Sequence, residues 1–365
     1  MSEPSRILIE QDSPNQSLFA VVEDNGQAVY LHLVGRQGSG YPTRSLWIRN
    51  LGPAATRLEE GWQNAPHGPS LPINACRHPA GLPPLDTEKL SFVWYPEGDS
   101  VALLEGEQVL GVIPPWAGLE DCPGHARDCS SQTPIAWPIG PVANNAVLRT
   151  VDAARQLWEE WSPPHDPWTA LRQQYLETIE TGLGAPHAQY FAIDANRWPP
   201  KFLVRVETEE AHVLVTGGVS IRPQPQVRRQ VHQPETVRRI EVAMALPRTM
   251  PLQDLEPLYQ TLSRLASFPW RHNGWLTSGH TIPFPALPLG PHATPYVACV
   301  LQDTPPGAPD LDFPPVYGDP VCLLWLIPIT DAEFQYAQST GTQALTDALW
   351  RAGCTWIHQD RKSVF

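Results

Sequence analysis

The segment from Pro320 to Phe334, PVCLLWLIPITDAEF, constrains the fold of this chain more than any other segment. Residues 321–327 are apolar almost without interruption, and the run has the length of a β-strand rather than of a helix. We interpret it as a buried central strand, although periodicity alone also allows a short buried helix. Thr330 and Glu333 then have the spacing of a capping box, which begins a helix. The segment therefore predicts a buried strand that leads directly into a helix.

A break at residues 162–167, SPPHDP, separates two helical patterns and suggests a domain boundary. The pattern before it runs from about Asn145 to Trp161, and the next helix begins after Asp166, with Pro167 at its first position. A chain of 365 residues is long enough for two domains, each with its own core. We predict an α+β fold with a β-rich domain at 1–162 that ends in a helix, and an α+β domain at 163–365. Each domain is expected to hold a mixed or antiparallel sheet with packed helices.

Short apolar runs predict the strands of both domains. Asn25-Gly26 lies between two such runs and predicts a hairpin. We also expect Asp254 to cap a helix and Gly353 to end the last one. The remaining strand predictions are 45–51, a meander over 90–116, 188–194, 201–207, 212–221, 238–246, 293–302 and a last strand at 354–358.

Charge and composition exclude several classes of partner. The formal net charge is −13, which disfavours nucleic acid and anionic membrane surfaces. No window reaches the roughly 18 apolar residues of a membrane span. The first residues lack the pattern of a signal peptide, and the six cysteines are few for the length, so we expect a cytoplasmic protein with reduced thiols.

Cysteine and histidine residues suggest a metal site that their spacing does not support. Cys122, His125 and Cys129 lie close together in the sequence, and Cys76 with His78 could complete a zinc set. The intervals are irregular, and no second pair with metal-ligand spacing follows. We therefore expect no metal.

We likewise expect no catalytic site and no cofactor. Ser278 and His280 are the best candidates for a hydrolase, which is the alternative function. No G-x-S-x-G elbow, phosphate-binding loop or dinucleotide fingerprint accompanies them. A structural turn or a ligand-facing loop is the simpler interpretation.

Residues 222–239 invert the sign of the charge, since five arginines stand against the single acid Glu235. Such a segment either receives an acidic peptide or forms a solvated loop. The arginines are Arg222, Arg228, Arg229, Arg238 and Arg239.

From about Leu214 onward, seven motifs in order resemble the suppressor-of-fused family. They are Gly217–Ser220, Arg239–Leu246, Leu262–Trp270, Ser278–Phe284, Ala298–Pro305, Ile329–Glu333 and Ile357–Ser363. The first 160 residues look like the N-terminal region of bacterial members. The resemblance implies binding without catalysis: the animal member clamps a short peptide of a transcription factor as an added strand, and bacterial members look like immunity proteins of polymorphic toxin systems. The loop after Ser220 departs from the animal pattern, so the animal ligand is not expected here.

We therefore expect a non-catalytic protein that neutralises or sequesters a polypeptide, most simply a toxin, with a regulatory adaptor as an alternative. Residues 1–165 carry 10 basic and 19 acidic side chains, and this acidic part is expected to meet a basic partner. The candidate partner-binding residues are Arg222, Arg228, Arg229, Arg238, Ser278, His280, Glu59, Glu60, Glu105 and Glu107.

Overall fold

The computed structural model describes residues 5–37, 40–58, 61–62, 68–141, 145–194, 198–287 and 296–365. The chain divides into two compact units. The first contains residues 1–165, 228–231 and 270–274, and the second contains the rest. The α+β class is confirmed, because helices and sheets occur in both units. None of the described helices has the length and apolar character that a membrane crossing needs.

The first unit contains two sheets that share one core. The four-stranded antiparallel sheet has the order β1-β2-β3-β4, and the five-stranded sheet has the order β5-β6-β7-β8-β9. The predicted hairpin at Asn25-Gly26 joins β2 to β3. Their bounds are β1 (Arg6–Asp12), β2 (Leu18–Asp24), β3 (Ala28–Gly35), β4 (Arg44–Asn50), β5 (Leu90–Trp94), β6 (Val101–Glu105), β7 (Gln108–Ile113), β8 (His125–Ala126) and β9 (Trp137–Pro138).

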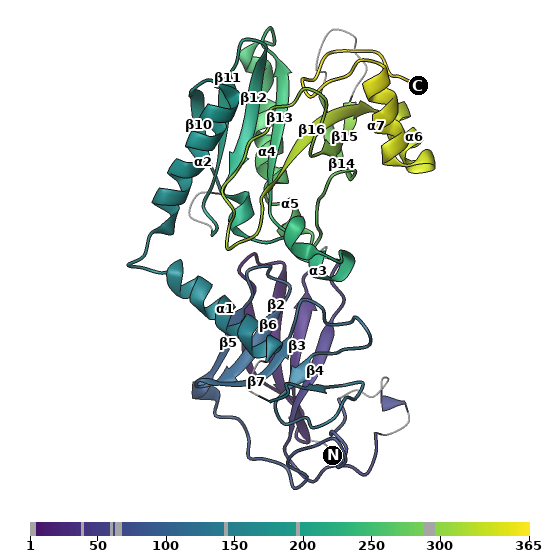
Figure 1. Ribbon diagram of the computed structural model, residues 1–365. Helices are drawn as coiled ribbons and strands as arrows, with labels where there is room; N and C mark the ends of the chain where they lie inside the picture. Colours follow the sequence, from purple (N-terminus) through teal and green to yellow (C-terminus); the bar gives the residue numbers. More distant parts are fainter. Residues whose placement is uncertain are drawn as a thin grey trace. The chain divides into compact units, whose positions relative to one another are not determined.

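Helix α1 (Ala146–Glu160) covers the outer face of the five-stranded sheet (Figure 1). Alternation along β6 explains this layering: Val101 and Leu103 pack in the core between the sheets, whereas Ala102 and Leu104 pack against α1. The Asn145 side chain accepts hydrogen bonds from the first free N–H groups of the helix. The helix predicted for this segment is thus confirmed, with its apolar face on the sheet.

The second unit is built on a seven-stranded sheet of order β10-β11-β12-β13-β16-β15-β14. Neighbouring strands are antiparallel except β13 and β16, which are parallel. The strands are β10 (His187–Ile193), β11 (Lys201–Glu207), β12 (Ala211–Gly217), β13 (Ile240–Pro247), β14 (Thr281–Leu287), β15 (Tyr296–Gln302) and β16 (Cys322–Thr330). The helices are α2 (Pro167–Leu183), α3 (Val227–Gln230), α4 (Leu252–Leu265), α5 (Phe268–Arg271), α6 (Asp331–Thr340) and α7 (Thr342–Arg351). Residues 228–230 of α3 and residues 270–271 of α5 group with the first unit.

Helices cover both faces of this sheet. Tyr175 and Ile179 of α2 and Leu345 of α7 pack in one core with the β11 residues whose side chains point to that face. On the other face, Tyr259 of α4 contacts the ring of Phe191, with 4.5 Å between ring centroids. The sheet is therefore buried on both sides, which explains why its central strands have continuous apolar sequences.

The segment that opened the sequence analysis forms an interior strand and a capped helix, as predicted. Strand β16 lies between β13 and β15, and residues 323–330 are buried. The Thr330 hydroxyl accepts from the Glu333 backbone N–H, and the Glu333 carboxylate accepts from the Thr330 N–H. Both halves of the capping box are present.

Three local predictions are wrong. The strand predicted at 212–221 ends at Gly217, and Val219–Ile221 form a short 3-10 helix. Pro251, not Asp254, precedes the first turn of α4, and Asp254 lies within that turn. Residues 354–358 do not form a strand: Ile357 makes one isolated bridge with Ala245 of β13. A single bridge supports the chain end locally without extending the sheet.

Candidate binding site

The two outer strands of the seven-stranded sheet differ in their capacity to accept another strand. Strand β14 carries Pro283 and Pro285, which have no backbone N–H to donate. Strand β10 contains no proline, and among the described strands only β11 pairs with it. An unblocked edge presents backbone N–H and C=O groups that an extended peptide can use. The β10 edge is therefore the candidate binding site (Figure 1).

The side chains of β10 are accessible, yet its position is fixed. Tyr190 is 38% exposed, and 5.3 Å separates the centroid of its ring from that of Phe202 on β11. At the start of the strand, the Glu180 carboxylate of α2 accepts hydrogen bonds from the backbone N–H and ring Nδ1 of His187. These bonds lower the pKa of Glu180. The edge thus presents exposed aromatic and small side chains, and the start of the strand is tied to α2.

The arginine-rich segment is largely turned inward rather than solvated. Arg222 is 3% exposed and lies over the Trp198 ring at 5.9 Å. Arg238 and Arg239 both bind the Asp319 carboxylate, with N–O distances of 2.6–2.8 Å. Charge-assisted bonds of this kind order the segment from within.

A buried glutamate holds the bend that follows β12. The Glu241 carboxylate accepts from the Ser220 N–H at 3.0 Å, from the Ser220 hydroxyl at 2.7 Å and from the Thr216 hydroxyl at 2.7 Å. Complete burial nevertheless raises the pKa of Glu241 to about 7. Tyr175 hydrogen-bonds the Ser220 hydroxyl from α2, so this network joins a helix to two strands.

Most of these elements lie within one matched region. Residues 190–361 match the sequence model of the suppressor of fused protein (SUFU) family. This region is a SUFU domain. The match covers a little under half of the chain. A search of curated proteins found no match.

Two solved structures resemble part of the chain. A SUFU homologue from Neisseria gonorrhoeae FA 1090 shares 18% identity, with a TM-score of 0.40, over 54% of this chain and 98% of its own. The structure of a Sufu-Fu complex shares 14% identity, with a TM-score of 0.38, over 53% of this chain and 92% of its own.

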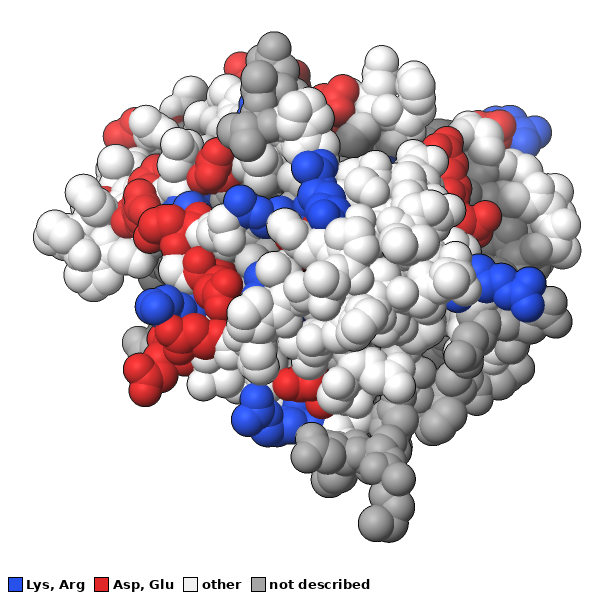
Figure 2. All heavy atoms as spheres, turned by 90° about the horizontal axis from the view of Figure 1, so that it is seen from below, with Lys and Arg blue, Asp and Glu red and all other residues white. Residues whose placement is uncertain are grey.

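The remaining arginine and acidic candidates are dispersed. Arg228 and Arg229 group with the first unit, where the Arg228 Nε lies 3.6 Å from the Glu97 carboxylate. Glu105 accepts a hydrogen bond from the Asp86 N–H, whereas the Glu107 side chain is 96% exposed. Glu59 and Glu60 lie outside the described residues. On the face drawn in Figure 2, acidic groups cluster along one side with basic groups among them.

Ser278 and His280 of the SUFU domain have separate partners. The Ser278 hydroxyl donates to the Asp303 carboxylate at 2.9 Å. The His280 ring packs edge-on against Trp275, with 4.7 Å between centroids, and burial lowers its pKa. Within the described residues, no hydrogen bond joins the serine to the histidine, so this geometry does not activate a nucleophile.

Three cysteines and one histidine of the first unit form two pairs, Cys122 with His125 and Cys76 with Cys129. The Cys122 Sγ lies 3.8 Å from the His125 Nε2, and the His125 Nδ1 donates to the Pro138 carbonyl. Cys129 instead lies opposite Cys76 in an isolated bridge, and burial raises the pKa of its thiol to about 11. No group of three potential metal ligands occurs in the described part of the chain.

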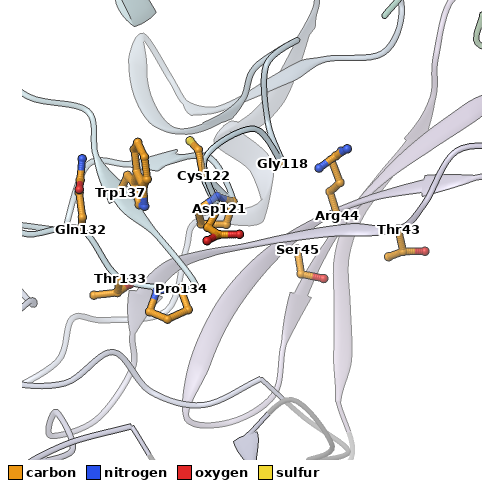
Figure 3. A pocket seen from close by; sticks show the side chains of 11 residues that line it. Thr43, Arg44, Ser45, Gly118, Asp121, Cys122, Gln132, Thr133, Pro134 and Trp137 are labelled. Carbon is orange, nitrogen blue, oxygen red and sulfur yellow. The ribbon is translucent and has the colours of Figure 1, made fainter. Parts of the chain in front are cut away.

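Cys122 lines a hollow of about 510 Å³ in the first unit (Figure 3). Figure 3 shows Arg44 and Ser45 from β4 on one side and Trp137 with Gln132 on the other. Burial raises the pKa of the Cys122 thiol, so it is a neutral thiol rather than a nucleophilic thiolate. We interpret this pair as a packing element.

Sequence reasoning missed the β10 edge, although its signal was present. The strand at 188–194 was predicted, and the TIPFPAL sequence of β14 contains the two prolines that mark an edge strand. What the sequence did not reveal was that β10 is the outer strand at the opposite side of the sheet.

Proposed function

We propose that this protein binds a polypeptide without catalysis, by adding an extended segment of its partner to the β10 edge. The observation that carries the proposal is the contrast between the two sheet edges: β10 contains no proline and pairs with β11 alone among the described strands, whereas β14 contains Pro283 and Pro285. Strand addition draws its affinity from main-chain hydrogen bonds, so it does not require the groove residues of the animal family members.

The partner we propose is a toxin that the same cell produces, which this protein neutralises as an immunity protein. The SUFU domain at 190–361 and the motif order in the sequence support this role. The net charge of −13 supports capture of a basic polypeptide, because electrostatic attraction speeds association.

Co-expression with the product of the adjacent gene tests the proposal. A stable complex is expected, and hydrogen exchange of the β10 amides should slow on binding while that of the β14 amides stays unchanged. Protection at β14, or at neither edge, would contradict strand addition at β10.

Side-chain variants distinguish specific binding at the β10 edge from non-specific hydrophobic association. Tyr190→Ala should weaken the complex about tenfold, because an exposed aromatic residue at a contact contributes roughly 1–2 kcal/mol. Leu252→Ala is the matched control, since Leu252 is 51% exposed in the same unit and lies at the start of α4. Equal effects of both variants would refute binding at the β10 edge. Absence of any toxic neighbour or co-purifying polypeptide would refute the immunity role.

A further inference from the structure

One hollow of the first unit gathers positive charge in an acidic part of the chain. Its volume is about 1110 Å³. Four of the ten arginine and lysine residues within 1–165 line it, together with His78. They are Arg77, Arg127, Arg149 and Arg155. These residues lie far apart in the sequence, and only the fold brings them together.

Two of these guanidinium groups have N–H donors that no described residue occupies. Arg127 follows β8, Arg149 lies in the first turns of α1, and both residues are exposed. Within the described residues, neither guanidinium forms a hydrogen bond or an ion pair. The positive charge of Arg127 does act on its neighbour Asp128 and favours the ionised carboxylate. The N–H donors of both guanidinium groups remain available to a ligand in the hollow.

Two of the three acidic residues that line the hollow already have ionic partners. Asp128 is buried and lies 3.7 Å from Arg49 and 3.8 Å from His78. Glu107 lies 3.4 Å from Arg155 and is almost fully exposed, so this pair is weak and Arg155 can exchange it for another carboxylate. Asp152 of α1 is the remaining acid. The charged side chains that line the hollow therefore favour an anionic ligand.

Apolar side chains also line the hollow. They are Val109 of β7, Leu148 of α1 and Ile139. The volume slightly exceeds the range typical of small-molecule pockets, roughly 300–1000 Å³. A lining that combines apolar and cationic groups suits a polypeptide that carries both acidic and apolar side chains. A compact polyphosphate would use the cations but not the apolar side chains.

We propose that this hollow binds an acidic segment of a polypeptide, whose carboxylates pair with Arg127 and Arg149 and whose apolar side chains rest on Val109 and Leu148. The guanidinium fork suits carboxylates because two parallel N–H···O bonds form at once. This site belongs to the first unit, and it does not depend on the β10 edge proposed above.

A labelled peptide of alternating glutamate and leucine, titrated against the full chain by fluorescence anisotropy, tests the site. The double variant Arg127→Glu/Arg149→Glu should weaken binding at least tenfold, and added salt should weaken binding to the native protein. Arg6→Glu/Arg57→Glu is the matched control, because it makes the same charge change at two exposed arginines of the same unit outside the hollow. The control should change affinity less than twofold.

Three results would overturn the proposal. The first is no detectable peptide binding to the native protein. The second is an equal loss of affinity in both double variants, which would indicate a general charge effect. The third is displacement of the peptide by ATP or inorganic phosphate at lower concentration than by unlabelled peptide, which would assign the hollow to a phosphorylated ligand. Arg127→Gln/Arg149→Gln removes the two positive charges without reversing them and provides a second variant if the charge reversal fails to fold.

Discussion

Arg361, four residues before the last residue of the sequence, binds Glu333 through both terminal nitrogens of its guanidinium group. Its Nη2 donates to the Glu333 Oε2 at 2.9 Å, and its Nη1 donates to Oε1. The Glu333 side chain is fully buried, and it also accepts from the backbone N–H groups of Thr330 and Val364. One carboxylate thus caps α6 and fastens residues 361–364 to the SUFU domain.

Arg361→Ala should lower the free energy of unfolding by about 3 kcal/mol, because it leaves a buried carboxylate without its cation. Burial opposes ionisation of Glu333, but the bonds from Arg361 outweigh it and lower the pKa. This contribution is therefore present above the unfolded pKa of about 4.5 and is lost as the pH falls below it. Denaturant titrations at pH 7 and pH 3 measure both effects. Lys362→Ala, at an exposed neighbour, is the control and should change stability by less than about 0.5 kcal/mol.

Glu241 should give the opposite pH dependence. Its pKa is raised from 4.5 to about 7 in the folded protein, so unfolding releases a proton between these values. The free energy of unfolding should consequently fall as the pH rises from about 4.5 to about 7, by on the order of 3 kcal/mol. Glu241→Gln cannot titrate and should lack this slope. Parallel pH profiles for the two proteins would show that Glu241 does not titrate in this range.

The two acids of the meander should differ in their effect on folding. Glu105 accepts a hydrogen bond from the Asp86 N–H at 2.9 Å and lies 3.7 Å from Arg49. Glu105→Lys should therefore lower the free energy of unfolding by about 1–3 kcal/mol. Glu107 is 96% exposed, and Glu107→Lys should stay within about 0.5 kcal/mol. Thermal unfolding of both variants measures the contrast. A test of partner steering by charge reversal should therefore use Glu107, since Glu105→Lys would also change stability.

Local signals made much of the fold predictable. The apolar run of β16 and the capping box after it are properties of adjacent residues, and so are the Asn25-Gly26 hairpin and the apolar face of α1. Strand β1 (Arg6–Asp12) was missed because it is an edge strand whose apolar side chains are not buried, as Ile7 at 52% exposure shows. Its sequence therefore lacks the alternation that identifies a half-buried strand.

The candidate sites depended on contacts that the sequence does not encode locally. The arginine-rich segment appeared to be a candidate for an acidic ligand, but Asp319, 80 residues later, accepts from Arg239 and makes the segment internal. Conversely, Arg77, Arg127 and Arg149 are isolated in the sequence, and tertiary packing alone places them around one hollow. Charge runs are visible in a sequence, whereas charge clusters require the fold.

Gly218 provides the last test, because it lies in the bend between β12 and Ser220, which hydrogen-bonds Glu241. Its φ is +90°, and an added Cβ would lie 2.4 Å from the Pro200 carbonyl oxygen and 3.0 Å from the Trp168 ring. Gly184 is a matched control, with φ +67° and no atom within 4 Å of an added Cβ. Alanine at either position would have to adopt a left-handed backbone conformation, which should lower the free energy of unfolding by about 1 kcal/mol.

Only Gly218→Ala should add a clash with the backbone. It should therefore lower the free energy of unfolding by about 3 kcal/mol or more in total. Chemical denaturation of the two variants measures the difference directly. Because the bend positions Ser220, Gly218→Ala should also weaken the bonds to Glu241 and reduce the pH slope between about 4.5 and 7, which Gly184→Ala should leave unchanged. Equal losses of stability in the two variants would show that the bend relaxes and that its close approach to Pro200 is not required.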